Sequence, residues 1–397
     1  MMRMMKRLQE LASLIPNARL SGSDAEITSI ERDSRRVGEG ALFVCIAGAH
    51  VDAHSFIPNA ARAGARAILT ERETVDVSEG LSVLHVPDLQ EALDIIVPYF
   101  YDHPARSMRV IGITGTNGKT TTSYLVRAIL RHAGKRVGLI GTIQVMMEDE
   151  VFPTANTTPD VIVMQQLLAE MRARGMDAVV MEVSSHALDQ GRVAGIEFDT
   201  AVFTNLTQDH LDYHGTMENY ARAKARLFDL VSEAGTKAGK TAVLNADDAA
   251  SVTMRAHTRC PVISYGVESK ADLAARDVHL AQDGMELTLV HGEAEPVKLH
   301  ISITGLFNVY NVLAATGAAL AEKIGAADIA AALRAFTGVP GRFELVRAGQ
   351  DFSVIVDYAH TPDGMENVLR TARAVTAGRI IAVFGCGGDR DRTKRPI

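Results

Sequence analysis

The chain has 397 residues, of which 47% are hydrophobic and 22% charged, and a formal net charge of −7. This length suggests two or three domains, each large enough to bury its own core. The negative charge argues against nucleic acid as the main partner, because phosphate backbones attract basic surfaces.

Cysteine and hydrophobic patterning narrow the class further. Cys45, Cys260 and Cys386 are too scattered for a disulfide framework or a Cys-rich zinc site, so we expect a reducing compartment, the cytoplasm. No apolar run approaches the roughly 20 residues of a membrane span, so no membrane insertion is expected. Residues 1–15 read as an amphipathic helix interrupted by charges, and not as a secretory signal.

Residues 1–107 are predicted to form a small N-terminal α/β domain. Its expected strands lie at 27–30, 41–46 and 67–69, and its expected helices at 56–63 and 89–101. A polar loop, Asp33-Ser34-Arg35-Arg36, separates the first two strands, and by itself it is best interpreted as a solvated turn.

The most informative stretch is 108–122, at the start of a predicted central domain over 108–337. An apolar strand at 110–113 is followed by the turn Gly115-Thr116-Asn117-Gly118 and by a helix that begins with Lys119-Thr120-Thr121. Such a turn brings backbone N–H groups and a helix N-terminus to an anion. Lys119 would reach the β- and γ-phosphates and Thr120 would bind Mg²⁺. The match to the usual phosphate-loop pattern is imperfect, because Ile113 stands where the first glycine is expected.

Strands and helices alternate after this turn, which predicts a mostly parallel sheet covered on both faces. Expected strands are 137–140, 178–181 and 200–203, with a helix over 161–174, a hairpin near 285–290 and a helix over 307–322. Polar clusters follow two of the strands, at 182–186 and 204–210. Ligands bind beyond the carboxyl ends of parallel strands, so both clusters should face the phosphate turn.

Residues 338–397 are predicted to begin a third, Rossmann-like domain after a Gly-Val-Pro-Gly linker. A strand at 353–356, a helix over 364–377 and a strand at 380–384 are expected there. One crossover with two strands is too small to bury itself, so we expect this domain to be incomplete.

Seven motifs, in order along essentially the whole chain, resemble those of the Mur ligase family. They are Gly-Thr-Asn-Gly-Lys-Thr-Thr at 115–121, Glu-Val-Ser-Ser-His at 182–186, Thr-Asn-Leu-Thr-Gln-Asp-His-Leu-Asp-Tyr-His at 204–214, Tyr-Ala-Arg-Ala-Lys-Ala-Arg-Leu-Phe at 220–228, Phe-Asn-Val-Tyr-Asn at 307–311, Pro-Gly-Arg-Phe-Glu at 340–344 and Asp-Tyr-Ala-His-Thr-Pro at 357–362. The likeness is greatest to members that add the third amino acid to UDP-N-acetylmuramoyl-L-alanyl-D-glutamate. It implies an ATP-dependent amide ligase of peptidoglycan precursor synthesis that forms an acyl phosphate on the D-glutamyl residue.

The resemblance also implies roles for individual residues. The ATP-binding set comprises Gly115, Thr116, Asn117, Gly118, Lys119, Thr120, Thr121, Asn308, Asn311, Arg342 and Asp357, although the paired asparagines could equally be helix caps. The UDP-dipeptide set comprises Arg32, Ser34, His50, Val51, Asp52, Asn156, Thr157, Thr158, Ser184, Gln190 and Arg192. Arg390 matches an arginine that contacts meso-diaminopimelate, which favours that amino acid over lysine. The family's main motif for selecting the added amino acid would lie beyond residue 397. We expect the protein to be a monomer.

The implied catalytic residues are Lys119, Glu182, His210 and Lys224. Thr120 and Glu182 would hold one Mg²⁺ and His210 a second. From sequence alone, Lys224 is best interpreted as part of a solvated basic helix face with Arg222 and Arg226. In the family the matching lysine carries a CO₂-derived carbamate. An unmodified ammonium ~4 Å from a divalent ion would be repelled by roughly 8 kcal/mol at an effective dielectric constant of about 20. We therefore expect N6-carboxylysine at Lys224, beside the second Mg²⁺.

Three alternatives stay open at this point. A phosphate-loop ATPase or phosphotransferase would explain Lys119 and Thr120, but not Lys224 or the separate first domain. A ligase similar to folylpolyglutamate synthetase would share the ATP motifs. Finally, the chain could be a non-catalytic fragment that binds the UDP-sugar without closing over it.

Overall fold

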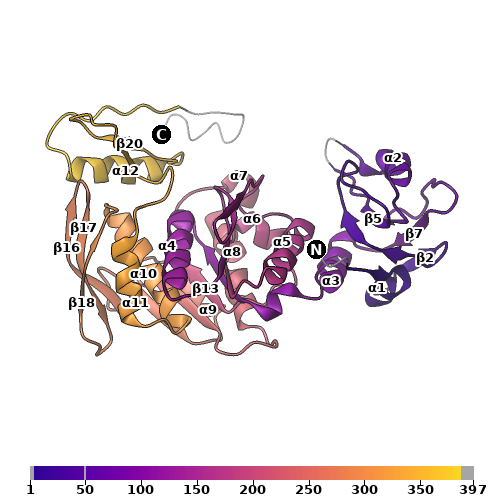
Figure 1. Ribbon diagram of the computed structural model, residues 1–397, viewed down its shortest axis with the longest axis horizontal. Coiled ribbons are helices and arrows are strands. Elements are labelled where there is room, and N and C mark those ends of the chain that lie inside the picture. The colour runs from indigo at the N-terminus through magenta and orange to yellow at the C-terminus, as the bar shows by residue number, and fades with distance from the viewer. Residues whose placement is uncertain (1–3, 49–50, 386–397) are drawn as a thin grey trace. The chain divides into compact units, whose positions relative to one another are not determined.

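The structure, a computed structural model, describes residues 4–48 and 51–385, which fall into two compact units (Figure 1). Unit 1 comprises Met1–Ser107, Pro159–Gly175 and Gln190–Ile196, and unit 2 comprises the remaining segments. The two later segments of unit 1 come from the stretch that the sequence assigned to the central domain. The boundaries after residues 107 and 337 stay a prediction.

Unit 1 is built on a five-stranded sheet in the order β2-β7-β6-β5-β4. The strands are β2 (Arg19–Ser21), β7 (Ser82–His85), β6 (Ala67–Thr70), β5 (Ala41–Val44) and β4 (Ser29–Glu31); only β2 runs antiparallel to its neighbour. A short ladder joins β1 (Lys6–Arg7) to β3 (Glu26–Ile27). The expected strands are present, whereas β2 and β7 were missed because they are short and only partly apolar.

Helices pack against this sheet, and apolar side chains of helices and strands form two buried clusters. The helical elements are α1 (Leu8–Leu14), η1 (Ala53–Phe56), α2 (Ile57–Arg62), α3 (Leu89–Phe100), η2 (Pro104–Ser107) and α5 (Val161–Ala173). Val161 and Ile162 of α5 are buried in the same cluster as Leu93 and Phe100 of α3. This packing explains why α5 belongs to unit 1, although it follows the phosphate turn in sequence.

Unit 2 contains an eleven-stranded sheet in the order β11-β10-β9-β12-β8-β13-β14-β15-β16-β17-β18. The central strands are parallel: β9 (Val137–Ile140), β12 (Ala178–Glu182), β8 (Arg109–Thr114), β13 (Thr200–Phe203), β14 (Thr241–Asn245), β15 (Val262–Gly266) and β16 (Leu273–Ala281). Antiparallel strands extend both ends: β10 (Val145–Met147) with β11 (Glu150–Phe152), and β17 (Gly284–His291) with β18 (Val297–Ile301). The predicted parallel sheet and hairpin are confirmed.

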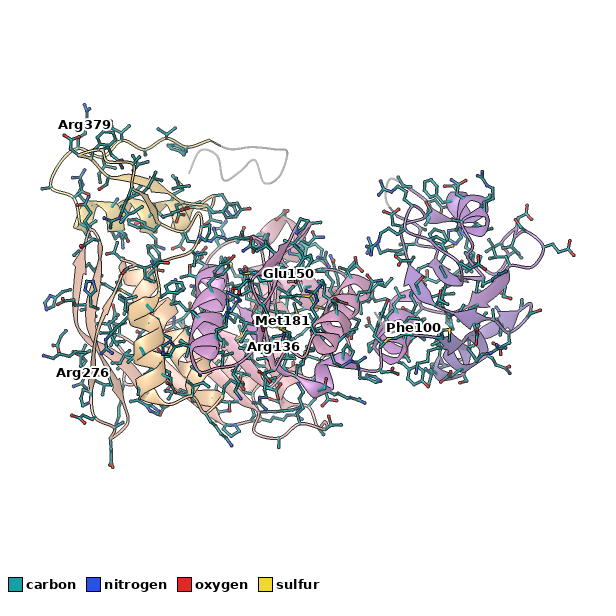
Figure 2. The ribbon with its side chains drawn as sticks, viewed as in Figure 1. Phe100, Arg136, Glu150, Met181, Arg276 and Arg379 are labelled. Carbon is teal, nitrogen blue, oxygen red and sulfur yellow. The ribbon has the colours of Figure 1, made fainter. Side chains whose placement is uncertain are left out.

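The helices of unit 2 form two groups that pack against this sheet. Helices α4 (Lys119–His132), α10 (Leu306–Ala321) and α11 (Ala326–Ala335) pack together, and α4 and α10 lie side by side in Figure 1. Helix α8 (Met217–Ser232) contacts β13 and β14, and α9 (Ser251–Ala256) contacts β14. The short helices α6 (Ser185–Asp189) and α7 (Leu211–His214) pack on α8. Figure 2 shows Met181 of β12 inside unit 2 and Arg276 of β16 at its surface.

The last described segment holds β19 (Glu344–Val346), β20 (Val354–Val356) and α12 (Pro362–Ala374), with the two strands paired antiparallel. The strand expected at 380–384 is wrong, because these residues have no strand partner and Ile381, Val383 and Phe384 are exposed. A strand forms only where a neighbour satisfies its backbone groups, and its apolar sequence alone does not supply one. No helix within 4–48 or 51–385 is both long and apolar enough to cross a membrane.

Candidate active site

The phosphate turn joins the end of β8 to the start of α4, as the sequence predicts. Gly115 and Gly118 have φ angles of 148° and 85°, which residues with a side chain rarely adopt. Gly118 directly precedes α4, so the loop N–H groups and the helix N-terminus converge on one region. This is the arrangement that binds a phosphate anion.

Polar residues after β13 hold the turn in place. Thr204 donates a hydrogen bond from its Oγ1 to the carbonyl of Asn117 at 2.6 Å, and the backbone N–H of Asn117 donates to Asn205 Oδ1 at 2.9 Å. The N–H of Thr116 donates to the carbonyl of Asn205 at 2.9 Å. Since β8 and β13 are neighbours in the sheet, the turn and the 204–210 cluster meet at one edge. The prediction that this cluster faces the turn is confirmed.

Glu182, at the end of β12, completes the other side of the loop. It is only 1% exposed and accepts hydrogen bonds from the Thr120 hydroxyl at 3.0 Å and the Thr142 hydroxyl at 2.9 Å. The Thr142 N–H donates to its second oxygen at 2.8 Å. The buried carboxylate is therefore fixed beside Thr120, the residue that the phosphate-loop pattern assigns to a metal.

Two lysines reach the same loop carbonyl. Lys119 and Lys224 each donate from Nζ to the Gly115 carbonyl at 2.8 Å. Burial lowers the pKa of both amines, and for Lys224 the neighbouring Lys119 lowers it further, whereas Asp209 opposes the shift. Lys224 is 1% exposed, so its interpretation as part of a solvated basic face is wrong. Its helix α8 turns this one cation inward while Arg222 stays exposed.

His210 follows β13 and lies in a cluster of rings at the same edge. Its φ of 53° is left-handed, and its Nε2 is 3.3 Å from Asp209 Oδ2. The His186 and Tyr220 rings lie 4.7 Å and 6.1 Å from it. Burial lowers the pKa of His210 to about 4 against the opposing effect of Asp209, so its imidazole is neutral at pH 7 and able to act as a ligand.

The side chains of Thr120, Glu182 and His210 are of the types that bind a divalent cation. In the described part of the chain, no group of three His, Cys, Asp or Glu side chains is arranged to hold a metal ion. Thr120 and Glu182 supply oxygen atoms, which Mg²⁺ prefers, and His210 supplies a neutral nitrogen. The ammonium of Lys224 is the member that does not fit while it is charged, because it would repel the cation.

The predicted nucleotide residues on α10 and after it lie near the loop. The Asn311 carbonyl oxygen accepts from the Thr122 hydroxyl at 3.4 Å, and its amide donates to Asn308 at 2.9 Å. Both asparagines are buried and neither is a helix cap, because α10 is capped by Gly305. The helix-cap alternative is therefore wrong, while an adenine contact stays a prediction.

Arg342 and Asp357 lie in the segment after the linker. Arg342 donates to Thr120 Oγ1 at 3.1 Å and lies over the Tyr358 ring at 4.6 Å. Asp357 accepts from the backbone N–H groups of Phe343 and Ala359, both at 2.7 Å. Arg342 therefore joins the phosphate loop, whereas Asp357 organises the backbone around Arg342. Its predicted ribose contact is untested.

The residues predicted for the UDP-dipeptide fall into separate sets. Arg32, Ser34, Val51, Asp52, Gln190 and Arg192 belong to unit 1, and Asn156, Thr157, Thr158 and Ser184 belong to unit 2. Thr157 and Thr158 adjoin the phosphate loop region through Thr142 and the Glu182 carbonyl. In unit 1, Arg192 donates twice to Gln190, and Asp52 is paired with His54 and Arg72. His50 and Arg390 lie outside the described residues.

Sequence reasoning missed three residues of this site. Asp209 is 6% exposed, and its negative charge raises the pKa values of Lys119, Lys224 and His210 against the effect of burial. Thr142 donates two hydrogen bonds to Glu182. The ring of Tyr220 packs under the Lys224 amine. Asp209 and Tyr220 fall within quoted motifs, but no spacing rule distinguishes them from surface residues. Thr142 follows β9, at the same carboxyl edge, and that position was the available signal.

Replacing Gly118 with alanine is expected to destabilise the fold by about 2–3 kcal/mol and to weaken ATP binding. The residue has a left-handed φ, and its new Cβ would lie 2.3 Å from Asn311 Oδ1. Gly134→Ala is a matched control, since Gly134 has φ +79° and no atom within 4 Å of the added Cβ. Urea unfolding and ATP titration of both variants measure the effect. Equal losses in the two would show that the Asn311 contact is unimportant.

A parallel sheet with a phosphate loop at its switch point, a buried Glu–Thr pair and two inward lysines defines a nucleotide-dependent phosphoryl-transfer domain. The chain belongs to the Mur ligase family. Three family models match it: "Mur ligase family, catalytic domain" at 26–103, "Mur ligase middle domain" at 113–319 and "Mur ligase, glutamate ligase domain" at 341–397. Members of this family are ATP-dependent ligases that form peptide bonds and use ATP and Mg²⁺.

Curated relatives agree with this assignment. The chain is 50% identical over 373 residues to the UDP-N-acetylmuramoyl-L-alanyl-D-glutamate–2,6-diaminopimelate ligase of Bacillus cereus, covering 94% of this chain and 75% of that protein. It is 47% identical over 395 residues to the ligase of the same name from Geobacillus thermodenitrificans, covering 98% and 80%.

Solved structures share the fold. A structure of a UDP-N-acetylmuramoyl-L-alanyl-D-glutamate–2,6-diaminopimelate ligase superposes with a TM-score of 0.75 at 32% identity, covering 93% of this chain and 75% of that one. A folylpolyglutamate synthetase variant from L. casei superposes with a TM-score of 0.59 at 19% identity, covering 72% and 76%, which shows a common fold alone. The predicted α/β fold of the Mur ligase type is confirmed.

Proposed function

We propose that this protein is the ATP-dependent ligase that joins meso-2,6-diaminopimelate to the D-glutamyl residue of UDP-N-acetylmuramoyl-L-alanyl-D-glutamate. The γ-phosphate of ATP passes to the side-chain carboxylate of that residue and ADP leaves. The diaminopimelate amine then attacks the acyl carbon, inorganic phosphate departs, and the amine loses a proton as the amide forms.

The observation that carries this proposal is the convergence of Lys119, Lys224, Glu182 and Thr120 on one loop. Phosphoryl transfer needs positioning and charge neutralisation more than covalent help from the protein. The Lys119 ammonium neutralises phosphate charge, and Arg342 adds a second cation beside Thr120. Thr120, Glu182 and His210 would hold Mg²⁺, which neutralises the phosphates further when bound.

Lys224 is proposed to work as a carbamate. Its burial and the nearby Lys119 both favour the neutral amine, whose lone pair can attack CO₂. An N–C bond forms, one C=O bond of CO₂ becomes a single bond to an anionic oxygen, and a proton leaves Nζ. The product is an anion where the free lysine is a cation. A residue that would repel a cation thus becomes a ligand for it, as N6-carboxylysine.

The choice of substrates rests on the relatives, which are named as diaminopimelate-adding ligases, and on the predicted roles of the UDP-dipeptide residues and Arg390. The test incubates the protein with ATP, the UDP-dipeptide and either diaminopimelate or L-lysine. Phosphate release that requires diaminopimelate supports the proposal. Release that requires lysine would reassign the amino acid, and release that requires neither would favour a simple ATPase.

Activity is expected to depend on dissolved CO₂, and more strongly as the pH falls. Carbamate forms only from the neutral amine, and protonation of Lys224 at lower pH removes that species. Its lowered pKa keeps more neutral amine at pH 7 than an ordinary lysine has. Rates measured in CO₂-depleted buffer from pH 6 to 9, with and without added bicarbonate, test this. Carbon-13-labelled bicarbonate should give a carbamate NMR resonance that Lys224→Ala lacks. Rates that ignore CO₂ at every pH would contradict it.

A further inference from the structure

Two side chains from successive turns of helix α8 contact two adjacent residues of the phosphate loop. Lys224 donates to the carbonyl of Gly115, and Tyr220, four residues earlier, places its hydroxyl 3.2 Å from Thr116 Oγ1. Residues four apart lie on the same helix face. One face of α8 therefore holds both Gly115 and Thr116.

The direction of the Tyr220 hydrogen bond follows from the partners of Thr116. The Thr116 hydroxyl donates to the Thr207 carbonyl at 3.1 Å, and it accepts from the Thr207 N–H at 3.0 Å. Its single proton is then used, which leaves one lone pair as acceptor. Tyr220 must therefore donate, and burial supports this because it raises the pKa of the phenol and keeps it protonated.

The Tyr220 ring also packs against the amine of Lys224. The Lys224 Nζ lies 4.3 Å from the ring centroid, and Tyr220 is 1% exposed. The Tyr220 ring also packs against His214, with centroids 5.2 Å apart, and His214 Nε2 is 2.9 Å from Ser185 Oγ. Tyr220 is thus held by contacts with both Lys224 and His214, which set the position of its hydroxyl in the free protein.

We propose that Tyr220 is a positioning residue for ATP, whose hydroxyl holds Thr116 so that the phosphate loop is ordered in the free protein. An ordered loop loses less conformational freedom on binding, which raises affinity without adding a contact to the ligand. The inference rests on the proposed ATP-dependent function, but it assigns to Tyr220 a role that touches neither the nucleotide nor the reacting atoms.

The test is a double-mutant cycle of Tyr220→Phe and Thr116→Val in the full chain. Tyr220→Phe removes one neutral hydrogen bond to Thr116, so it is expected to raise KM for ATP about five- to tenfold and to leave kcat within about twofold. Thr116→Val removes the same hydrogen bond together with the two that join the Thr116 hydroxyl to Thr207, so its KM for ATP should rise at least as much. The double variant should resemble Thr116→Val alone, since that change already removes the interaction with Tyr220. KM for the UDP-dipeptide should not change.

Tyr265→Phe is the matched control. Tyr265 is also fully buried in unit 2. Its hydroxyl donates to the Phe203 carbonyl at 2.9 Å and lies 3.5 Å from the Thr204 carbonyl, so it contacts the end of β13 and not the Thr116 hydroxyl. It should lower the melting temperature and leave KM for ATP unchanged. The proposal is overturned if Tyr220→Phe leaves KM for ATP unchanged, if Tyr265→Phe raises it equally, or if the two single effects multiply in the double variant. A wild-type protein without ATP-dependent ligation would instead overturn the proposed function.

Discussion

Lys224→Ala is expected to lower kcat at least ~1,000-fold, equivalent to about 4 kcal/mol of transition-state stabilisation. The variant loses the group that becomes an anion in the cation-binding region, and added bicarbonate cannot restore it. Lys224→Arg should be equally inactive, because a guanidinium keeps the positive charge but does not form a carbamate. Steady-state kinetics with saturating ATP and Mg²⁺, at low and high bicarbonate, measure both variants.

Arg222→Ala is the control for that experiment. Arg222 lies on the same helix, is exposed and donates to Asn219, so its loss should change kcat by less than about twofold. Thermal melting of all three variants separates inactivity from unfolding. A folded Lys224→Ala enzyme with substantial turnover would refute the role of Lys224. An active Lys224→Arg enzyme would show that a cation, and not a carbamate, is required.

Glu182→Gln should lower kcat by about 100-fold or more and should also lower the melting temperature. The carboxylate accepts three hydrogen bonds, two from hydroxyls and one from the Thr142 N–H. An amide has one oxygen, so its NH₂ group would face a donor, and the negative charge opposite the Mg²⁺ site disappears. Initial rates over a range of Mg²⁺ concentrations measure the loss.

Thr142→Ser provides the comparison, because serine retains both the hydroxyl and the backbone N–H that Glu182 accepts. Its activity should stay within about threefold of the wild type. If Glu182→Gln retained more than a tenth of the activity at ordinary Mg²⁺ concentrations, the assignment of Glu182 as a metal ligand would be wrong.

The phosphate loop and its partners could be predicted because local rules define them. A strand, a glycine turn and a helix start locate Lys119 and Thr120, and the edge rule for parallel sheets brings in the clusters at 182 and 204. Side-chain direction on α8 was not predicted correctly. Lys224 shares a helix face with Tyr220 and Phe228, an apolar pattern that indicates burial, but the flanking arginines suggested a solvated surface.

Long-range pairing was the part that sequence could not supply. Helix α5 has the apolar spacing of any amphipathic helix, and nothing in that spacing distinguishes packing on α3 from packing on the large sheet. The 380–384 segment is rich in β-branched and aromatic residues, yet a strand also needs a partner. The roles of Asn308, Asp357 and the UDP-dipeptide residues depend on bound ligands and stay predictions.

The position of β8 within its sheet has a consequence for synthesis of the protein. The strand ends at Thr114, but its two neighbours begin only at Ala178 and Thr200, so a growing polypeptide exposes the loop long before either neighbour has been translated. A nascent chain on the ribosome must postpone closing the nucleotide pocket until the second neighbour has emerged. Affinity for ATP is thus acquired only after translation has passed Thr200, the first residue of the second neighbour.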